Sequence, residues 1–197
     1  MQPPLLAHYS PLPERYDELF AAPGVPRAHW AMMLDEIASA STEALTSRLG
    51  IVEREVRDSG VTYNVYADPQ GLDRPWDLDV LPLILPATEW ALIARGAAQR
   101  ARLLNPLLGD LYGAGRLLRE GALPASLVLG HSGFLRPAVG TQAPGGIFLH
   151  SYAADLARSP DGSWWVLNDR TQAPSGAGYA LENRLLVARL FPDAFRA

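Results

Sequence analysis

Two stretches near the end of the chain, residues 147–158 and 163–171, are rich in apolar and aromatic residues, which is typical of β-strands. They are joined by Ser159-Pro-Asp-Gly162, a strong turn sequence. Proline presets its own φ, aspartate bonds to nearby backbone and glycine tolerates a positive φ. The pattern predicts an antiparallel β-hairpin, which fixes the residues of the two strands that lie side by side.

Polar residues stand late in both predicted strands. Asp155 is in the first strand, and Asn168 and Asp169 are in the second. In a hairpin closed near residues 159–162, these positions lie on neighbouring strands and can converge. Converging oxygen ligands suit Mg²⁺, which is bound by one or two carboxylates plus substrate phosphates. The three residues are therefore candidate metal ligands. The alternative is a solvated hairpin face with ordinary polar residues at the strand ends.

The hairpin is followed by a glycine turn, Pro174-Ser-Gly-Ala-Gly178, and a predicted helix over residues 179–191. The amides of such a turn and of a helix N-terminus can hold an anion. Ser175, Gly176 and the nearby Asn183 are therefore candidate cofactor-binding residues. The alternative is that the turn simply caps the helix.

Arg184 lies on the same predicted helix and is a candidate catalytic residue, because a guanidinium can clamp a carboxylate or phosphate through two hydrogen bonds. A structural ion pair with Glu182 or Asp169 is the alternative.

The spacing of apolar residues and the positions of glycine and proline predict the remaining elements. A proline-rich lead-in over residues 1–13 precedes a helical segment over 14–60, and residues 61–197 form the α/β portion. In the helical segment we expect a short amphipathic stretch from Asp17 and a helix from Ala28 with Trp30, Met33, Leu34 and Ile37 on one face. A further helix is expected to be capped by Ser41 or Thr42 and stopped by Gly50. In the α/β portion we expect a strand over 61–66, an edge strand or irregular segment over 78–85, helices over 88–104 and 106–120, and a short helix or turn over 124–129 closed by Gly130.

This order of elements indicates an α/β (α+β) fold, with a helical N-terminal segment, a small sheet and a C-terminal β-hairpin followed by a helix. Of the other residues, His131 and His150 are expected to be hydrogen-bonded or packed structural histidines. The five tryptophans are expected to anchor the core or an interface. No GxGxxG, P-loop, HExxH or GxSxG motif is present.

Composition excludes several classes of function. The net charge of −4 gives no electrostatic reason to expect a nucleic acid or an acidic membrane as partner. Cysteine is absent, which removes disulfides, thiolate metal sites and thiol nucleophiles. The 197-residue chain has no apolar run of the roughly 18 residues that a membrane span requires and no signal-peptide pattern, so we expect a cytoplasmic protein. All 17 basic residues are arginine, so no lysine ammonium is available to hold ATP phosphates.

Several segments together resemble the circularly permuted ATP-grasp proteins (type 2), relatives of glutathionylspermidine synthetase. The resemblance runs from about Pro13 to the C-terminus. Its most specific segment is Asp169-Arg-Thr-Gln-Ala-Pro-Ser-Gly-Ala-Gly-Tyr-Ala-Leu-Glu-Asn-Arg184. The other segments that carry it are Val61-Thr-Tyr-Asn-Val-Tyr66, Arg74-Pro-Trp-Asp-Leu-Asp-Val-Leu-Pro82, Leu103-Leu-Asn-Pro-Leu-Leu-Gly-Asp-Leu-Tyr-Gly113 and Leu127-Val-Leu-Gly-His-Ser-Gly-Phe-Leu-Arg-Pro137.

The resemblance implies a partial ATP-grasp-like fold and an ATP-dependent carboxylate–amine ligase with ATP and Mg²⁺ as cofactors. Such enzymes activate a carboxylate as an acyl phosphate, which an amine then attacks. The implied substrates are peptide-like or small amines and carboxylates. The metal pattern implied is an acidic residue on one strand and Glu-x-Asn on the next. These positions fall on Asp155 and on Asn168-Asp169-Arg170, so asparagine replaces the glutamate and arginine replaces the asparagine.

Three hypotheses follow. In the first, the chain is the N-terminal part of a longer ligase and is inactive on its own, because the lysine-bearing nucleotide grip is expected in the part that follows. In the second, it is a non-catalytic binding or scaffold protein with a degraded metal site, which Asn168 and Arg170 favour. In the third, it is an interaction module that forms a homo-oligomer.

Overall fold

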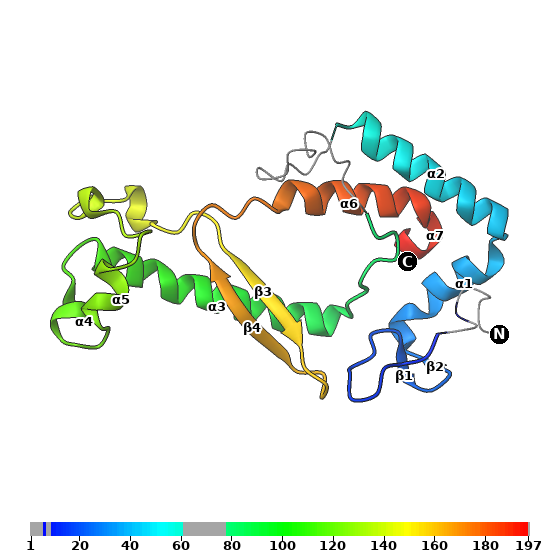
Figure 1. Ribbon diagram of the computed structural model, residues 1–197, viewed down its shortest axis with the longest axis horizontal. Coiled ribbons are helices and arrows are strands. Elements are labelled where there is room, and N and C mark those ends of the chain that lie inside the picture. The colour runs from blue at the N-terminus through cyan, green and yellow to red at the C-terminus, as the bar shows by residue number, and fades with distance from the viewer. Residues whose placement is uncertain (1–5, 7–8, 61–77, 197) are drawn as a thin grey trace. The chain divides into compact units, whose positions relative to one another are not determined.

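The computed structural model describes residue 6, residues 9–60 and residues 78–196 (Figure 1). Its contacts divide the chain into two units. Unit 1 comprises residues 1–86, 159–162 and 175–197, and unit 2 comprises residues 87–158 and 163–174. The predicted boundaries at residues 14 and 61 stay predictions. The strand predicted over residues 61–66 lies outside the described residues.

Unit 1 is mostly helical. Its elements are β1 (Phe20–Ala22), β2 (Val25–Pro26), η2 (Ala28–Trp30), α1 (Ala31–Ser39), α2 (Thr42–Asp58), α6 (Ala177–Leu190) and α7 (Pro192–Arg196). The predicted C-terminal helix is therefore confirmed as α6, and α7 was not predicted. Residues 78–86 form no strand, so the irregular segment was the correct alternative.

The amphipathic stretch predicted from Asp17 is wrong, because these residues lead into a small antiparallel pair of strands. β1 pairs with β2 around Gly24, whose φ is 73°. The Asp17 carboxylate holds the start of β1 by accepting the N–H groups of Leu19 at 2.9 Å and of Phe20 at 2.6 Å. Aspartate side chains that bond to the backbone two residues on form turns of this kind, and the prolines and Gly24 that follow do not continue a helix.

The helix predicted from Ala28 is confirmed, with its first turn as η2. Its four predicted apolar residues are all buried. Ser41 caps α2, as predicted, by accepting the N–H of Ala44 at 3.1 Å. The predicted stop at Gly50 is wrong, because α2 continues to Asp58. Val52 and Val56, four residues apart on one face, are both buried, and their packing outweighs the weak helix propensity of one glycine.

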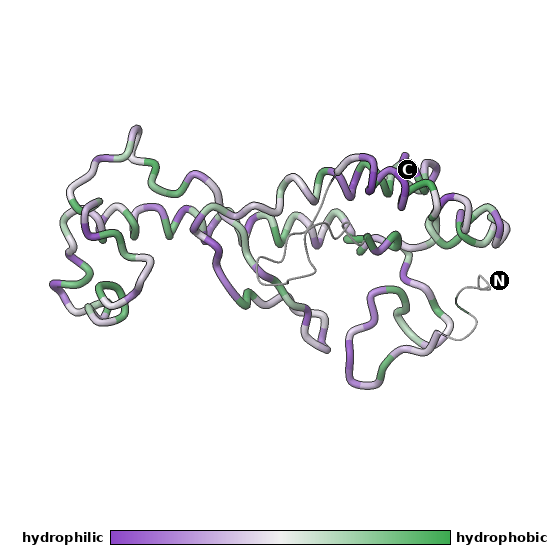
Figure 2. The backbone as a smooth tube through the Cα atoms, turned by 45° about the horizontal axis from the view of Figure 1, so that its top comes forward, coloured by the Kyte–Doolittle hydropathy of each residue, from purple (hydrophilic) through white to green (hydrophobic). Residues whose placement is uncertain are grey.

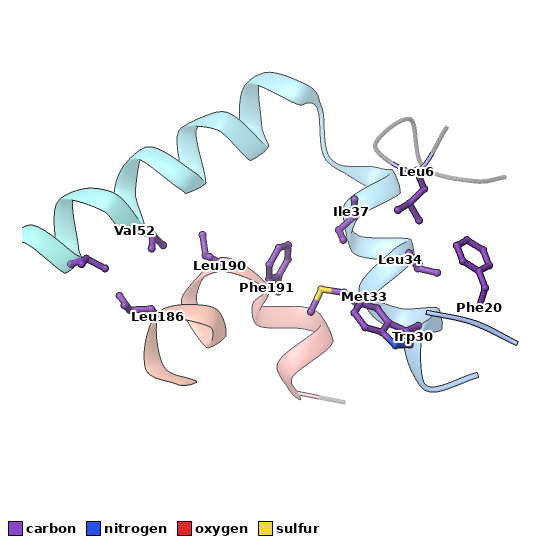
Figure 3. Close-up of a cluster of buried hydrophobic side chains, with 11 residues drawn as sticks. Leu6, Phe20, Trp30, Met33, Leu34, Ile37, Val52, Leu186, Leu190 and Phe191 are labelled. Carbon is purple, nitrogen blue, oxygen red and sulfur yellow. The ribbon is translucent and has the colours of Figure 1, made fainter. Parts of the chain in front are cut away.

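The core of unit 1 joins the two ends of the chain (Figure 3). Leu186 and Leu190 of α6, and Phe191 directly after it, lie in one cluster with the buried residues of α1 and α2. Glu36 of α1 is also buried, and its carboxylate accepts hydrogen bonds from Arg48 at 3.2 Å and from the N–H of Ala194 at 2.8 Å. Such a buried charge is tolerated because it is paired and hydrogen-bonded.

Unit 2 contains one long α-helix, two short α-helices, two 3-10 helices and a β-hairpin. The elements are α3 (Ala87–Leu111), α4 (Arg116–Arg119), α5 (Ala125–Leu129), η3 (Arg136–Ala138), η4 (Pro144–Gly146), β3 (Ala153–Arg158) and β4 (Trp164–Arg170). The predicted hairpin and the short helix closed by Gly130 are confirmed. Helices with small antiparallel sheets in the described chain confirm the predicted α+β arrangement.

The structure merges the helices predicted over residues 88–104 and 106–120 into α3, which runs through Pro106 and ends at Leu111. Thr88 is therefore inside the helix and not its cap. Asn105, beside the proline, donates from its side chain to the Gly146 carbonyl at 3.0 Å. Its side-chain oxygen accepts the N–H groups of Phe148 and Leu149, at 2.9 and 3.0 Å. These bonds occupy the backbone ahead of β3, which explains why the strand predicted from Ile147 begins only at Ala153.

The two histidines have different surroundings. His131 accepts the N–H of Gly133 at 3.0 Å, which confirms the expected hydrogen-bonded structural histidine. His150 is exposed and lies before β3, so its predicted position inside a strand is wrong. Trp30 is buried, whereas Trp90 and Trp165 are exposed, and Trp76 lies outside the described residues.

Apolar side chains are distributed differently in the two units, although hydrophobic positions occur along the chain in both (Figure 2). Every buried apolar residue of the described chain belongs to unit 1. The described residues of unit 2 include none. None of the helices that the structure describes is long and apolar enough to span a bilayer.

The burial of α6 gives a direct test of the unit 1 core. Leu186 is 1% exposed, whereas Leu181 on the same helix is 60% exposed. We expect Leu186→Ala to lower the free energy of unfolding by about 2–5 kcal/mol, because it removes buried methyl groups and leaves a cavity. Leu181→Ala should change it by less than about 0.5 kcal/mol. Urea denaturation followed by circular dichroism measures both, and equal losses would contradict the placement of Leu186.

Candidate functional site

The candidate metal site is built on the β3–β4 hairpin of unit 2. Asp155 lies directly opposite Asn168, and Ala154 lies opposite Asp169. One step nearer the turn, Leu156 lies opposite Val166 and not opposite Leu167. Leu167 is therefore an extra residue in β4, and its side chain is 69% exposed.

This β-bulge decides which side chains share a face. A regular hairpin continued from the Leu156–Val166 pair would set Leu167 opposite Asp155 and Asp169 opposite Ala153. Asp155 and Asp169 would then lie on one face, because side chains alternate along each strand. The extra residue shifts the register by one, so that Asn168 and Arg170 share the face of Asp155.

On this first face, the Asp155 carboxylate is engaged by Arg170. The Arg170 Nε donates to both carboxylate oxygens, at 3.0 and 2.9 Å, and an Nη atom lies 2.9 Å from Oδ2. The Asn168 side-chain amide is 3.4 Å from Asp155 Oδ2, a long and weak hydrogen bond. The bonds from Arg170, and then that from Asn168, lower the pKa of Asp155 below its ordinary value.

Asp169 lies on the opposite face, against α3. Arg100 of α3 binds its carboxylate through two hydrogen bonds of 2.8 and 2.5 Å, and the Tyr152 hydroxyl donates to it at 2.6 Å. The Arg100 guanidinium is the main reason that the pKa of Asp169 is lowered to about 2, and Tyr152 adds to it. One side of α3 therefore holds this face of the hairpin, because Glu89, about three turns before Arg100, pairs with Arg158 at 2.6 Å.

The structure thus brings two of the three predicted metal ligands together. Asp155 and Asn168 are neighbours, whereas Asp169 is on the other face and is bound by Arg100 and Tyr152. No group of three or more His, Asp or Glu residues that could hold a metal occurs within the described part of the chain. A metal ion at Asp155 would therefore depend on this one carboxylate, the Asn168 amide and oxygens from a substrate.

The predicted anion-binding turn lies at the start of α6, in unit 1. Ser175 and Gly176 are exposed, and no side chain caps the helix at Gly176. The backbone donors of this turn are therefore not taken by a capping side chain. Their role in cofactor binding stays a prediction.

Asn183 and Arg184 lie further along α6 and line a cavity of about 610 Å³ in unit 1. Neither ion pair considered for Arg184 forms among the described residues. Its guanidinium lies over the ring of Phe195, 4.8 Å from the ring centre.

Comparison with known proteins places these residues in a family. The model of the circularly permuted ATP-grasp type 2 family matches residues 82–197, which include the hairpin, the turn and α6. The chain belongs to the circularly permuted ATP-grasp type 2 family. ATP-grasp proteins generally bind ATP and Mg²⁺.

Several longer relatives match almost the whole chain. The Synechocystis protein sll0335 is 39% identical over 181 residues, which is 92% of this chain and 38% of that protein. The Mycobacterium tuberculosis protein Rv2567 is 38% identical and Rv2411c is 36% identical, each over 91% of this chain. The chain spans 21% of Rv2567 and 32% of Rv2411c, so it spans well under half the length of these relatives.

Sequence reasoning missed two residues that hold this ATP-grasp hairpin, Arg100 and Tyr152. Arg100 is 69 residues from Asp169 in sequence, and no local pattern links them. Tyr152 is closer to a detectable signal, because it lies within the strand predicted over residues 147–158, whose predicted partner carries Asp169 near its end. The departure of Arg170 from the family pattern was visible in the sequence, but its pairing with Asp155 was not.

The pKa of Asp169 provides a test of its pairing with Arg100 on the face of the hairpin that lies against α3. Because the folded pKa of about 2 is below the ordinary 3.8, the stability that the ionised Asp169 contributes is present above pH 3.8 and is lost as the pH falls towards 2. We expect Arg100→Gln to raise the pKa of Asp169 towards 3.8. Arg95→Gln, also on α3, should leave it unchanged. A carboxyl-detected NMR titration measures both, and an unchanged value in Arg100→Gln would contradict the pairing.

Proposed function

We propose that this chain is the N-terminal part of an ATP-dependent carboxylate–amine ligase of the ATP-grasp type, related to glutathionylspermidine synthetase. Its substrates would be peptide-like or small amines and carboxylates, its location cytoplasmic, and the chain alone inactive. One observation carries the proposal: in a chain of this family, Asp155 and Asn168 lie side by side on an exposed face of the hairpin. The lack of lysine supports the dependence on further polypeptide.

Asp155 and Asn168 are the residues that would hold Mg²⁺. Their oxygens fit a cation that takes few protein ligands and completes its shell with water and phosphate oxygens. The ion would neutralise charge on the nucleotide phosphates during phosphoryl transfer.

Arg170 has to leave Asp155 before a cation can bind there. The pair is solvent-exposed, with 58% of the Arg170 side chain and 40% of the Asp155 side chain accessible. Exposed pairs contribute about 0–1 kcal/mol, so opening this one costs little compared with the free energy of binding a metal–nucleotide complex. A displaced Arg170 is long enough to contact a phosphate oxygen instead, as arginines do in phosphate sites.

A second candidate function is a non-catalytic binding or scaffold protein. The observation that favours it is the Arg170–Asp155 pair, in which a guanidinium already neutralises the carboxylate that a metal would need. If this pair persists in the whole protein, the fold is retained without the metal.

The ligase proposal can be tested in a chimera in which this chain replaces the matched segment of sll0335. We expect the chimera to bind ATP in calorimetry only with Mg²⁺, and Asp155→Asn to weaken that binding about tenfold or more, because it removes the single carboxylate on this face. The same substitution at Asp169 tests the other face. An equal loss of affinity in Asp169→Asn would indicate that the ion binds on the α3 side. The proposal is contradicted if sll0335 binds ATP and the chimera does not.

A double substitution separates the two candidate functions. Asn168→Glu with Arg170→Asn restores the ligand pattern implied by the family and removes the cation from Asp155. If the chain retains a nucleotide site, we expect this variant of the chimera to bind Mg²⁺–ATP more tightly than the unsubstituted chimera, by about tenfold. No gain in affinity would favour the non-catalytic scaffold. Circular dichroism on both proteins controls for folding.

A further inference from the structure

We infer that the cavity beside α6 in unit 1 binds a small monocarboxylate with an apolar body, and that Arg184 holds its carboxylate. This inference goes beyond the proposed function, because the cavity requires neither ATP nor Mg²⁺ and lies in the other unit from Asp155 and Asn168.

The cavity has the size and lining of a small-molecule site. Its volume of about 610 Å³ falls within the roughly 300–1,000 Å³ typical of ligand pockets. Leu83 and Ile84 of the irregular segment, Val187 of α6 and Phe195 of α7 give it apolar walls. Side chains from three separate parts of the chain therefore converge on one hollow.

Arg184 supplies a positive charge that forms no ion pair with a carboxylate of the described residues. Three other arginines of unit 1 form ion pairs: Arg48 with Glu36, Arg189 with Glu55 and Arg196 with Asp193, at 3.2, 2.6 and 3.8 Å. Arg184 has no such carboxylate among the described residues. It lies instead over the Phe195 ring, which restrains the plane of the guanidinium and leaves its edge N–H groups able to bind an anion.

The rotation of α6 about its axis places the Arg184 guanidinium at the cavity. Arg184 and Val187 are three residues apart and lie on one side of α6, whereas Leu186 and Leu190 face the core. Core burial of these two leucines fixes the rotation of the helix. The cavity face, with Asn183, Arg184 and Val187, is thereby set as well.

The charge balance favours a carboxylate over a phosphate. The described lining has one cation, Arg184, and one acid, Asp79. Asp79 Oδ1 accepts the N–H of Leu81 at 3.1 Å, and its charge repels anions. A phosphate monoester carries nearly two negative charges at neutral pH, whereas a carboxylate carries the single charge that one guanidinium matches through two hydrogen bonds.

The experiment uses octanoate and 3-phenylpropionate, with octanamide and 3-phenylpropionamide as uncharged probes of matched shape. Each is titrated into the chain without ATP or Mg²⁺, and binding is followed by NMR at the side-chain amide of Asn183 and the ring of Phe195. We expect saturable binding of at least one carboxylate with a Kd on the order of 1 mM, since one guanidinium and a short apolar body must offset the entropy lost on binding. The matching amide should bind about tenfold more weakly, because it loses the charged hydrogen bonds.

Three substitutions isolate the role of Arg184. Arg184→Gln should weaken carboxylate binding about tenfold and leave amide binding unchanged, whereas Arg189→Gln, on the same helix but paired with Glu55, should change neither. Asp79→Asn retains the oxygen that accepts the Leu81 N–H and removes a negative charge, so it should strengthen carboxylate binding.

The inference is overturned if neither carboxylate shifts these signals saturably, if carboxylate and amide bind equally, or if Arg184→Gln has no effect. A failure here leaves the ligase proposal standing, because that proposal is tested by Mg²⁺–ATP binding to the chimera. A chimera without nucleotide binding likewise leaves this inference standing.

Discussion

The single extra residue in β4 determines the chemistry of the hairpin. Asn168 and Asp169 are neighbours in sequence, and only the strand register decides which of them joins Asp155. With Leu167 bulged out, the amide and not the carboxylate faces Asp155. Asp169 turns to α3, where it ties the helix to the hairpin through Arg100. A one-residue shift thus separates a site with two carboxylates from a site with one carboxylate and one arginine.

The two arginines on the hairpin have different roles because their surroundings differ. Arg158 has only 7% of its side chain accessible, pairs with Glu89 and lies over the Trp164 ring, so it packs the hairpin against α3. Arg170 pairs with Asp155 on the exposed face, and water screens this pair, so its contribution to stability is small. The first arginine is held in place by packing, whereas the second can move when a stronger ligand for Asp155 arrives. The ligase proposal depends on this difference.

Local sequence patterns predicted the elements that local forces decide. The Ser159–Gly162 turn, the Ser41 cap and the apolar face of α1 each depend on residues a few positions apart, and each is found in the structure. The errors fall where distant residues decide: α2 passes Gly50 because Val52 and Val56 are buried against other helices, and β3 starts late because Asn105 binds the preceding backbone. In the site, the sequence placed Asp155 beside Asn168–Asp169, but a bulge has no clear signature in a single sequence.

The two units differ in what holds them together, and this bears on where activity can reside. Unit 1 has a buried apolar cluster that joins both ends of the chain, and such burial is the main term that offsets chain entropy. The described part of unit 2 buries no apolar side chain, and Trp90, Trp165 and Leu167 are 59–69% exposed. Ion pairs such as Arg100–Asp169 orient its elements, but exposed pairs contribute too little to replace a core. Under the ligase proposal, activity requires a polypeptide of the relatives' length, of which this chain spans 21–38%, whereas the ligand binding inferred for the chain itself needs only the cavity of unit 1.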